Sequence, residues 1–309
     1  MRRILPACVL MWTVSTATHA ETPVIDDWKG TQAQTASAQE AGRHSVSIDA
    51  TVKTTSATPV DKPLIDGMAA GSTIGPLSDK PWLWRILRTQ WTDADEKGFE
   101  DFVRRIGESD CKTMQECLTS PTSNPRFHAT NPADMRFFAD CADLPYLLRA
   151  YYAWKNGLPF SFASGMRSLG SPGDIRYNNG NRVSTRKDLI FAGVDARRAI
   201  PDITTLVTTA QFRTAPEAAG QLLPDQYPVG VTRDSIKPGT IIYDAYGHIA
   251  VVYNVTHEGR VLFMDSHPDN SLTRGLYGRA FHRQAPSVGG GFKRWRPLKL
   301  VNATRQSDG

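Results

Sequence analysis

Two apolar runs joined by a turn restrict the fold of this chain more than any other feature. Residues 249–253 and 261–264 flank the turn dipeptide Glu258-Gly259, and residues 241–244 precede them as a further short apolar run. Short runs rich in β-branched residues and bounded by turn residues are typical of buried strands. The sequence therefore predicts an antiparallel β-hairpin that is buried on both faces and has polar residues clustered at one rim.

A helix is predicted to begin near Asp140. Its apolar residues recur at helical spacing, at Leu144, Leu147, Leu148 and Tyr151. Asp140 is a suitable N-cap, and Asp143, three residues later, fits the reciprocal position of a capping box. Gly157 supplies the C-terminal stop, while Pro145 removes one early hydrogen bond and can move the true start by a residue or two.

Cys141 lies at or beside the start of this helix. Unpaired backbone N–H groups and the positive end of the helix dipole stabilise a thiolate there. The same N–H groups can help to hold an oxyanion. This position predicts a nucleophilic cysteine, in contrast to a cysteine that only fills a core.

Cysteine pairing leads to the same residue. The chain has four cysteines, of which Cys8 lies in the leading apolar segment. Cys111 and Cys117 are close enough in sequence to bridge a short turn, and this pairing would leave Cys141 as an odd thiol. An odd thiol in an exported protein calls for a functional reason.

His248 is the best candidate for the base that activates the thiol. It opens the first strand of the hairpin, and a thiol nucleophile needs an imidazole nearby to accept its proton. Asp265, at the end of the second strand, can orient this imidazole. Simple counting across the hairpin places residue 269 opposite His248, but a bulge would shift that count. Asp269 and His267 therefore stay open as alternative partners.

Three motifs resemble the NlpC/P60 cysteine peptidases. Residues 140–144, Asp-Cys-Ala-Asp-Leu, resemble the family's nucleophile motif, residues 237–240 resemble its Pro-Gly segment, and residues 247–252 resemble its histidine strand. The resemblance selects Asp265 as the third polar residue. It implies an α+β fold with a papain-like core, in which a cysteine-bearing helix packs on an antiparallel sheet. It also implies endopeptidase or amidase action on peptidoglycan stem peptides.

The chain departs from that family pattern at three places. Thr240 stands where an acidic residue is usual, and Asp265 stands where histidine is commoner. Residues 158–236 form an insertion between the cysteine and the histidine. The bacterial transglutaminase-like cysteine proteinases share the Cys–His–Asp order and are kept as relatives.

The ends of the chain predict export. Residues 1–20 begin with positive residues, continue with a short apolar run and end in small residues at Ala20. This is the pattern of a secretory signal that is cleaved after Ala20. Residues 21–78 are polar without periodicity and are predicted to be a disordered linker or tail. The catalytic domain is predicted over residues 79–306. These assignments place the protein in the periplasm or outside the cell, without stable insertion in a membrane.

The remaining segments give coarser predictions. A helical subdomain is expected over 79–130, with helices at 81–91 and 95–106. A further helix is expected at 203–212, a long loop at 165–181, and a closing strand at 292–296.

Three other functions are weighed. A metal site would use His248, Asp265, His267 and Asp269, but no helical pair of ligands at close spacing supports it. A wall-binding module without catalysis would be expected to lack one of the three catalytic residues. An acyltransferase would use the same three. The formal net charge is +5 and the basic residues are scattered, so no nucleic-acid partner is expected. The sequence predicts an enzyme that uses no cofactor or metal and acts on peptidoglycan or another peptide.

Overall fold

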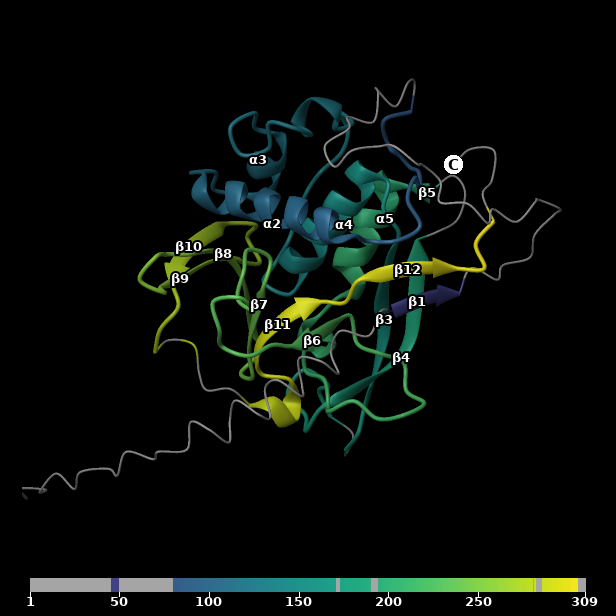
Figure 1. The fold of residues 1–309 in the computed structure, drawn as a ribbon, viewed down its shortest axis with the longest axis vertical. Helices are drawn as coiled ribbons and strands as arrows, with labels where there is room; N and C mark the ends of the chain where they lie inside the picture. Colours follow the sequence, from purple (N-terminus) through teal and green to yellow (C-terminus); the bar gives the residue numbers. More distant parts are fainter. Residues whose placement is uncertain are drawn as a thin grey trace, which may run out of the picture.

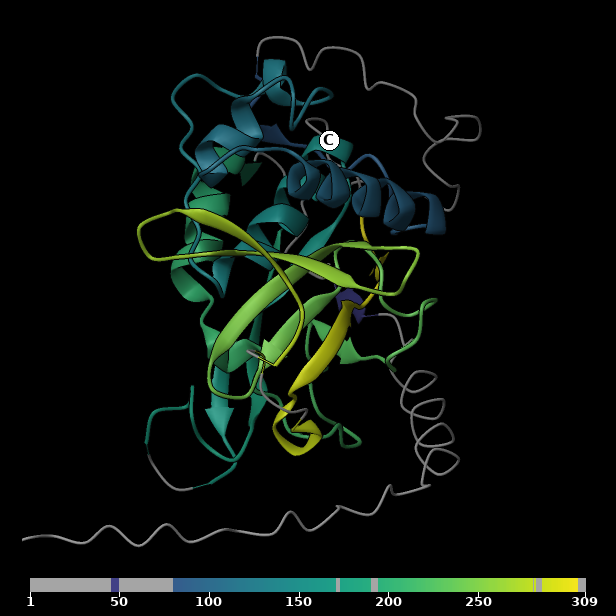
Figure 2. The same cartoon turned by 90° about the vertical axis from the view of Figure 1, so that its left-hand side faces the viewer.

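The computed structural model describes residues 46–49, 80–170, 173–189, 194–279, 281 and 285–304. The predicted signal at 1–20 lies outside the described residues, as does the predicted tail apart from residues 46–49. The chain forms an α+β fold, with helices gathered toward one end of the strands (Figures 1 and 2). The α-helices are α2 (Asp93–Glu108), α3 (Met114–Thr119), α4 (Asp143–Asn156) and α5 (Ala196–Leu206).

The largest sheet has six antiparallel strands in the order β10-β9-β8-β7-β11-β6. Strands β7 to β10 follow one another along the chain through short turns, so each pairs with the next. The predicted hairpin forms the centre of this sheet, and the predicted closing strand is confirmed as β11. The strands are β6 (Gln226–Pro228), β7 (Ile241–Asp244), β8 (His248–Val255), β9 (Val261–Ser266), β10 (Leu272–Leu276) and β11 (Gly291–Trp295).

Three smaller pairings complete the strands. The long hairpin joins β3 to β4, and β2 pairs with β5. β1 pairs in parallel with β12, although β1 lies within the stretch 21–78 that composition predicts to be a tail. The strands are β1 (Val46–Asp49), β2 (Leu83–Trp84), β3 (Phe160–Ser168), β4 (Asn181–Leu189), β5 (Val194–Asp195) and β12 (Leu298–Val301).

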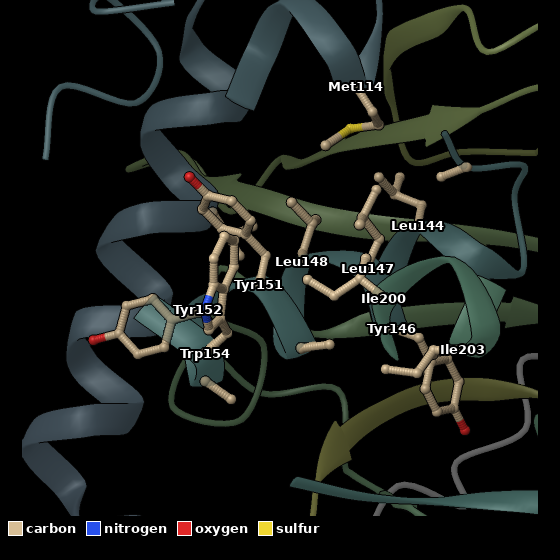
Figure 3. Close-up of a cluster of buried hydrophobic side chains, with 14 of the residues drawn as sticks. Met114, Leu144, Tyr146, Leu147, Leu148, Tyr151, Tyr152, Trp154, Ile200 and Ile203 are labelled. Carbon is tan, nitrogen blue, oxygen red and sulfur yellow. The ribbon is translucent and has the colours of Figure 1, made fainter. Parts of the chain in front are cut away.

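Helix α4 lies at the centre of the core. Every residue from Asp143 to Asn156 except Lys155 is buried. Figure 3 shows side chains of α4 gathered with Met114 of α3 and Ile200 of α5. The sequence predicts one apolar stripe, and the structure surrounds the helix on all sides, as expected for a helix whose other faces are also rich in aromatic and aliphatic residues. This burial fixes the position of the residues that precede α4.

The prediction of a helix over 81–91 is wrong. Trp84 lies in β2, and the indole N–H groups of Trp84 and Trp91 donate to the carbonyl oxygens of Leu158 and Pro159 at 3.1 and 2.9 Å. The segment runs extended past the C-terminal end of α4, so tertiary contacts override the helical spacing of its apolar residues.

The other predicted segments differ in their bounds. The helix predicted at 95–106 is confirmed within α2, whose capping box joins Thr92 and Asp95. The helix predicted at 203–212 is displaced, because α5 begins after the N-cap Asp195 and ends at Leu206. The loop predicted at 165–181 is shorter, since β3 and β4 extend into it from both sides. None of the helices in the described ranges combines the length and apolarity needed to cross a bilayer.

Candidate active site

The start of α4 is organised by Asp140. Its Oδ1 accepts hydrogen bonds from the backbone N–H groups of Ala142 and Asp143 at 2.8 and 3.1 Å. The Asp143 carboxylate accepts in return from the Asp140 N–H at 3.3 Å. The reciprocal bonds predicted between Asp140 and Asp143 are therefore confirmed, although α4 begins only at Asp143 with Ala142 as its N-cap, and they hold Cys141 in the turn that leads into the helix.

The capping changes one expectation about the oxyanion. The N–H groups of Ala142 and Asp143 already donate to the Asp140 carboxylate, so these two of the expected donors are not free for a substrate oxygen. Among the residues that the structure describes, no group accepts from the backbone N–H of Cys141. The nucleophile's own N–H is thus the donor near the thiol that an oxyanion can use.

His248 and Asp265 meet across the β8–β9 hairpin. The Nε2–H of His248 donates to Oδ2 of Asp265 over 2.8 Å. With the register shift between Val252 and Asn254, the pairing of β8 with β9 extends to His267 opposite His248, and Asp265 lies two residues further back on the same face. The shift accounts for one of the two positions by which simple counting to residue 269 misses this register.

Cys141 lies close to the same imidazole. The thiol is unpaired and half-buried, and it is one of the groups that raise the pKa of His248. Because Nε2 is occupied by Asp265, Nδ1 is the ring nitrogen free to accept a proton from a thiol. The structure therefore brings the three predicted site residues together.

The carboxylate of Asp265 has two further contacts. Thr273 on β10 donates its hydroxyl to Oδ1 of Asp265, and His267 Nε2 lies 3.9 Å from Oδ2. Burial would raise the pKa of Asp265, but the hydrogen bonds from His248 and Thr273 outweigh burial and hold the pKa below its ordinary value. Asp265 is therefore an anion that fixes the ring of His248 and stabilises its charged form.

His248 itself is strongly basic. Its hydrogen bond to Asp265 and then the nearby Cys141 thiol raise the pKa of His248 to about 10, against a smaller opposing effect of burial. Two aromatic groups lie near the ring, with centroid distances of 6.5 Å to His267 and 6.0 Å to Phe281. An imidazolium at neutral pH can pair with a thiolate and can later release its proton to a leaving group.

Comparisons with known proteins add no family assignment. Neither the protein-family models, nor the curated proteins, nor the solved structures include a match to this chain. The function has to be argued from the residues and their geometry.

The alternative partners of His248 have other roles. The Asp269 carboxylate is exposed and accepts from the N–H and hydroxyl of Ser271 at 2.9 and 2.6 Å. His267 Nε2 bonds to Thr273 Oγ1 at 3.3 Å and not to the ring of His248. In the described part of the chain no three metal-ligating side chains lie close enough to hold an ion.

The disulfide that the sequence left open is present. Cys111 and Cys117 are bonded, with their Cα atoms 5.2 Å apart, and Cys141 is the free cysteine among the described residues. Thr273 is the site residue that sequence reasoning missed. It lies on β10, two positions into a strand that carries no motif, and only the pairing of Thr273 with Asp265 in the β9–β10 register reveals it.

Proposed function

We propose that this chain is an exported cysteine hydrolase with a papain-like core, which cleaves amide bonds through Cys141, His248 and Asp265. The observation that carries the proposal is the imidazole of His248, which donates to the buried carboxylate of Asp265 and lies close to the free thiol of Cys141. A nucleophile, its base and the group that orients the base are grouped in this way in cysteine and serine hydrolases.

The chemistry follows from the charges. The Cys141 thiolate attacks the carbonyl carbon of an amide, and the negative charge that develops on the oxygen faces the Cys141 N–H. His248 gives its proton to the leaving nitrogen, the C–N bond breaks, and a thioester forms. Water, deprotonated by His248, then attacks the thioester, the C–S bond breaks, and a carboxylic acid leaves while the thiolate and the protonated imidazole are restored.

The proposed substrate is the peptide part of peptidoglycan. Support comes from the resemblance of residues 140–144, 237–240 and 247–252 to the NlpC/P60 peptidases. The helix that follows the cysteine packs against the histidine strand β8, which fits a papain-like core. A disulfide fits a protein that folds in an oxidising compartment outside the cytoplasm.

The test is digestion of purified peptidoglycan by the full chain. The number of new free amines and the masses of the released fragments give the rate and the scissile bond. Cys141→Ala and His248→Ala are expected to abolish release, because each removes a group that no neighbour replaces. His257→Ala is the matched control, since this histidine is exposed in the β8–β9 turn.

The same digestion separates hydrolysis from acyl transfer. Asp265 as the third residue is also what the transglutaminase-like relatives would have. With hydroxylamine added, a hydrolase gives mainly carboxylic acids and an acyltransferase gives mainly hydroxamates. Full amine release by Cys141→Ala would overturn the proposal.

A further inference from the structure

The segment that carries the nucleophile is tied to the β9–β10 turn by one side chain. The Oδ1 of Asn270 accepts from the backbone N–H of Ala139 over 3.3 Å, and Nδ2 donates to the carbonyl of Phe137 over 3.4 Å. In a parallel sheet the N–H and C=O of one residue bond in this way to the residues on both sides of its partner. The side-chain amide of Asn270 thus bonds to residues 137–139 as one residue of an added strand would.

A second tie lies next to the first. The hydroxyl of Ser266, which is fully buried, donates to the carbonyl oxygen of Ala139 over 2.6 Å. Ser266 directly follows Asp265, and Ala139 lies two residues before Cys141. A hydrogen bond therefore joins the backbone just after Asp265 to the backbone just before Cys141.

The backbone of Asn270 explains its residue type. Its φ is +65°, in the left-handed region, where asparagine is one of the few side chains that is readily accommodated. Its own N–H donates to the carbonyl of His267 at 2.8 Å, which closes the turn and aims the side chain at residues 137–139. Asn270 therefore both closes the β9–β10 turn and bonds to residues 137–139.

We propose that Asn270 is a positioning residue for the catalytic cysteine. It fixes the distance between Cys141 and the imidazole of His248 through the backbone of residues 137–139, and it contacts no reacting atom. This inference rests on the proposed function. Since a displacement of about 1 Å at a reacting group can cost a hundredfold in rate, loss of this tie weakens the thiol–imidazole pair without unfolding the chain.

The test compares two asparagines with left-handed backbones. Asn270→Gly keeps the turn geometry and removes only the side chain, and Asn302→Gly makes the same change at a residue beyond β12 that is also left-handed (φ +54°). Asn270→Asp keeps the acceptor for the Ala139 N–H and is the conservative variant. The readout is the iodoacetamide labelling rate of Cys141 at about pH 5, where a free thiol hardly reacts, with thermal melting measured in parallel.

Asn270→Gly is expected to lower the labelling rate at about pH 5 by about tenfold to a hundredfold, with Asn270→Asp between it and the wild type. Asn302→Gly is expected to label like the wild type. Unchanged labelling of Asn270→Gly beside a wild type that labels fast would overturn the positioning role. A wild type that does not label at this pH would instead overturn the proposed function, so the two failures are distinct.

Discussion

At the scale of single residues, the hydrogen bond between His248 and Asp265 sets the pH range of activity. That bond is the largest cause that raises the pKa of His248 to about 10. Asp265→Ala removes it, so the imidazolium loses its proton at lower pH. The basic limb of kcat/KM is expected to move from near pH 10 toward neutrality, with Asp265→Asn between the two.

Asp269→Asn serves as the control for this shift, because its carboxylate bonds only to Ser271 in the described structure. Its pH profile should match that of the wild type. A basic limb that stays in place in Asp265→Ala would show that Asp265 does not govern the protonation of His248.

The same pKa shift has a consequence for stability. The folded chain holds a proton on His248 with a pKa of about 10, against 6.5 for an ordinary histidine. The stabilisation from this proton is fully present below about pH 6.5 and is lost as pH rises through about 10. The melting temperatures of the wild type and His248→Ala should therefore differ most below about pH 6.5, and the difference should shrink as the pH rises toward 10. A difference in melting temperature that does not depend on pH would contradict this.

The catalytic residues were easier to predict from sequence than their supports. Cys141, His248 and Asp265 stand beside turn and cap residues that mark the ends of elements, and a motif needs only such local signals. Asn270 and Thr273 depend on the register of β9 with β10 and on how that turn meets residues 137–139. Such long-range contacts leave no periodic trace in the sequence.

At the scale of elements, the disulfide closes a loop that contacts both sides of the site. Lys112 O accepts from the N–H of Leu272 on β10 at 2.7 Å, and Gln115 Oε1 accepts from the N–H of Phe137 at 2.8 Å. Replacing Cys111 and Cys117 together by serine is expected to cost about 2 kcal/mol of unfolding free energy, because the closed loop is short. Urea unfolding measures this loss.

Dithiothreitol provides the control for the disulfide. It should destabilise the wild type to about the same extent as the double substitution and should leave the double variant unchanged. Equal urea midpoints for the oxidised wild type and the double variant would show that the bond adds nothing to stability.

The C-terminal end of α4 gives a second prediction at this scale. Gly157 has a φ of +62°, and a Cβ there would lie 2.7 Å from Cγ of Leu87. Gly157→Ala is expected to destabilise the fold by at least about 1–2 kcal/mol from the backbone alone. Gly170→Ala is the matched control, since its Cβ would meet no atom within 4 Å. Equal melting temperatures for the two variants would contradict the prediction.

The element boundaries show where local patterns fail. Residues 81–91 have helical spacing, but Trp84 and Trp91 donate to backbone oxygens at the end of α4 and hold the segment extended. The 95–106 helix was predictable because Thr92 and Asp95 cap it locally. A helix with local capping residues was predicted correctly, whereas helical spacing of apolar residues alone was overridden by tertiary packing.

At the scale of the whole molecule, Asp225 joins parts that are distant in sequence. Its buried carboxylate accepts from the Tyr146 hydroxyl of α4 at 2.7 Å, from the Ala163 N–H of β3 at 2.9 Å and from Arg186 of β4 at 2.6 Å. Its backbone oxygen accepts from the Arg296 N–H at 2.9 Å. The residue thus links the central helix to the β3–β4 hairpin and to the chain after β11.

Asp225→Ala is expected to cost about 3–5 kcal/mol, because it leaves the mostly buried guanidinium of Arg186 without its carboxylate. Chemical unfolding measures this loss. Asp202→Ala, which removes an exposed partner of Lys187, should change stability by less than about 1 kcal/mol. Similar losses for both variants would show that Asp225 does not join these parts.

The central claim is that His248 activates Cys141, and the pH profile of thiol labelling tests it most directly. The full chain is treated with iodoacetamide from mildly acidic to basic pH, beside Cys141→Ala and His248→Ala, and the label is located by peptide mapping so that Cys8 is counted separately. The account predicts fast labelling at about pH 5 that is absent in Cys141→Ala and much slower in His248→Ala. Labelling that rises only near pH 8.5, as for a free cysteine, and is the same in His248→Ala would contradict the account.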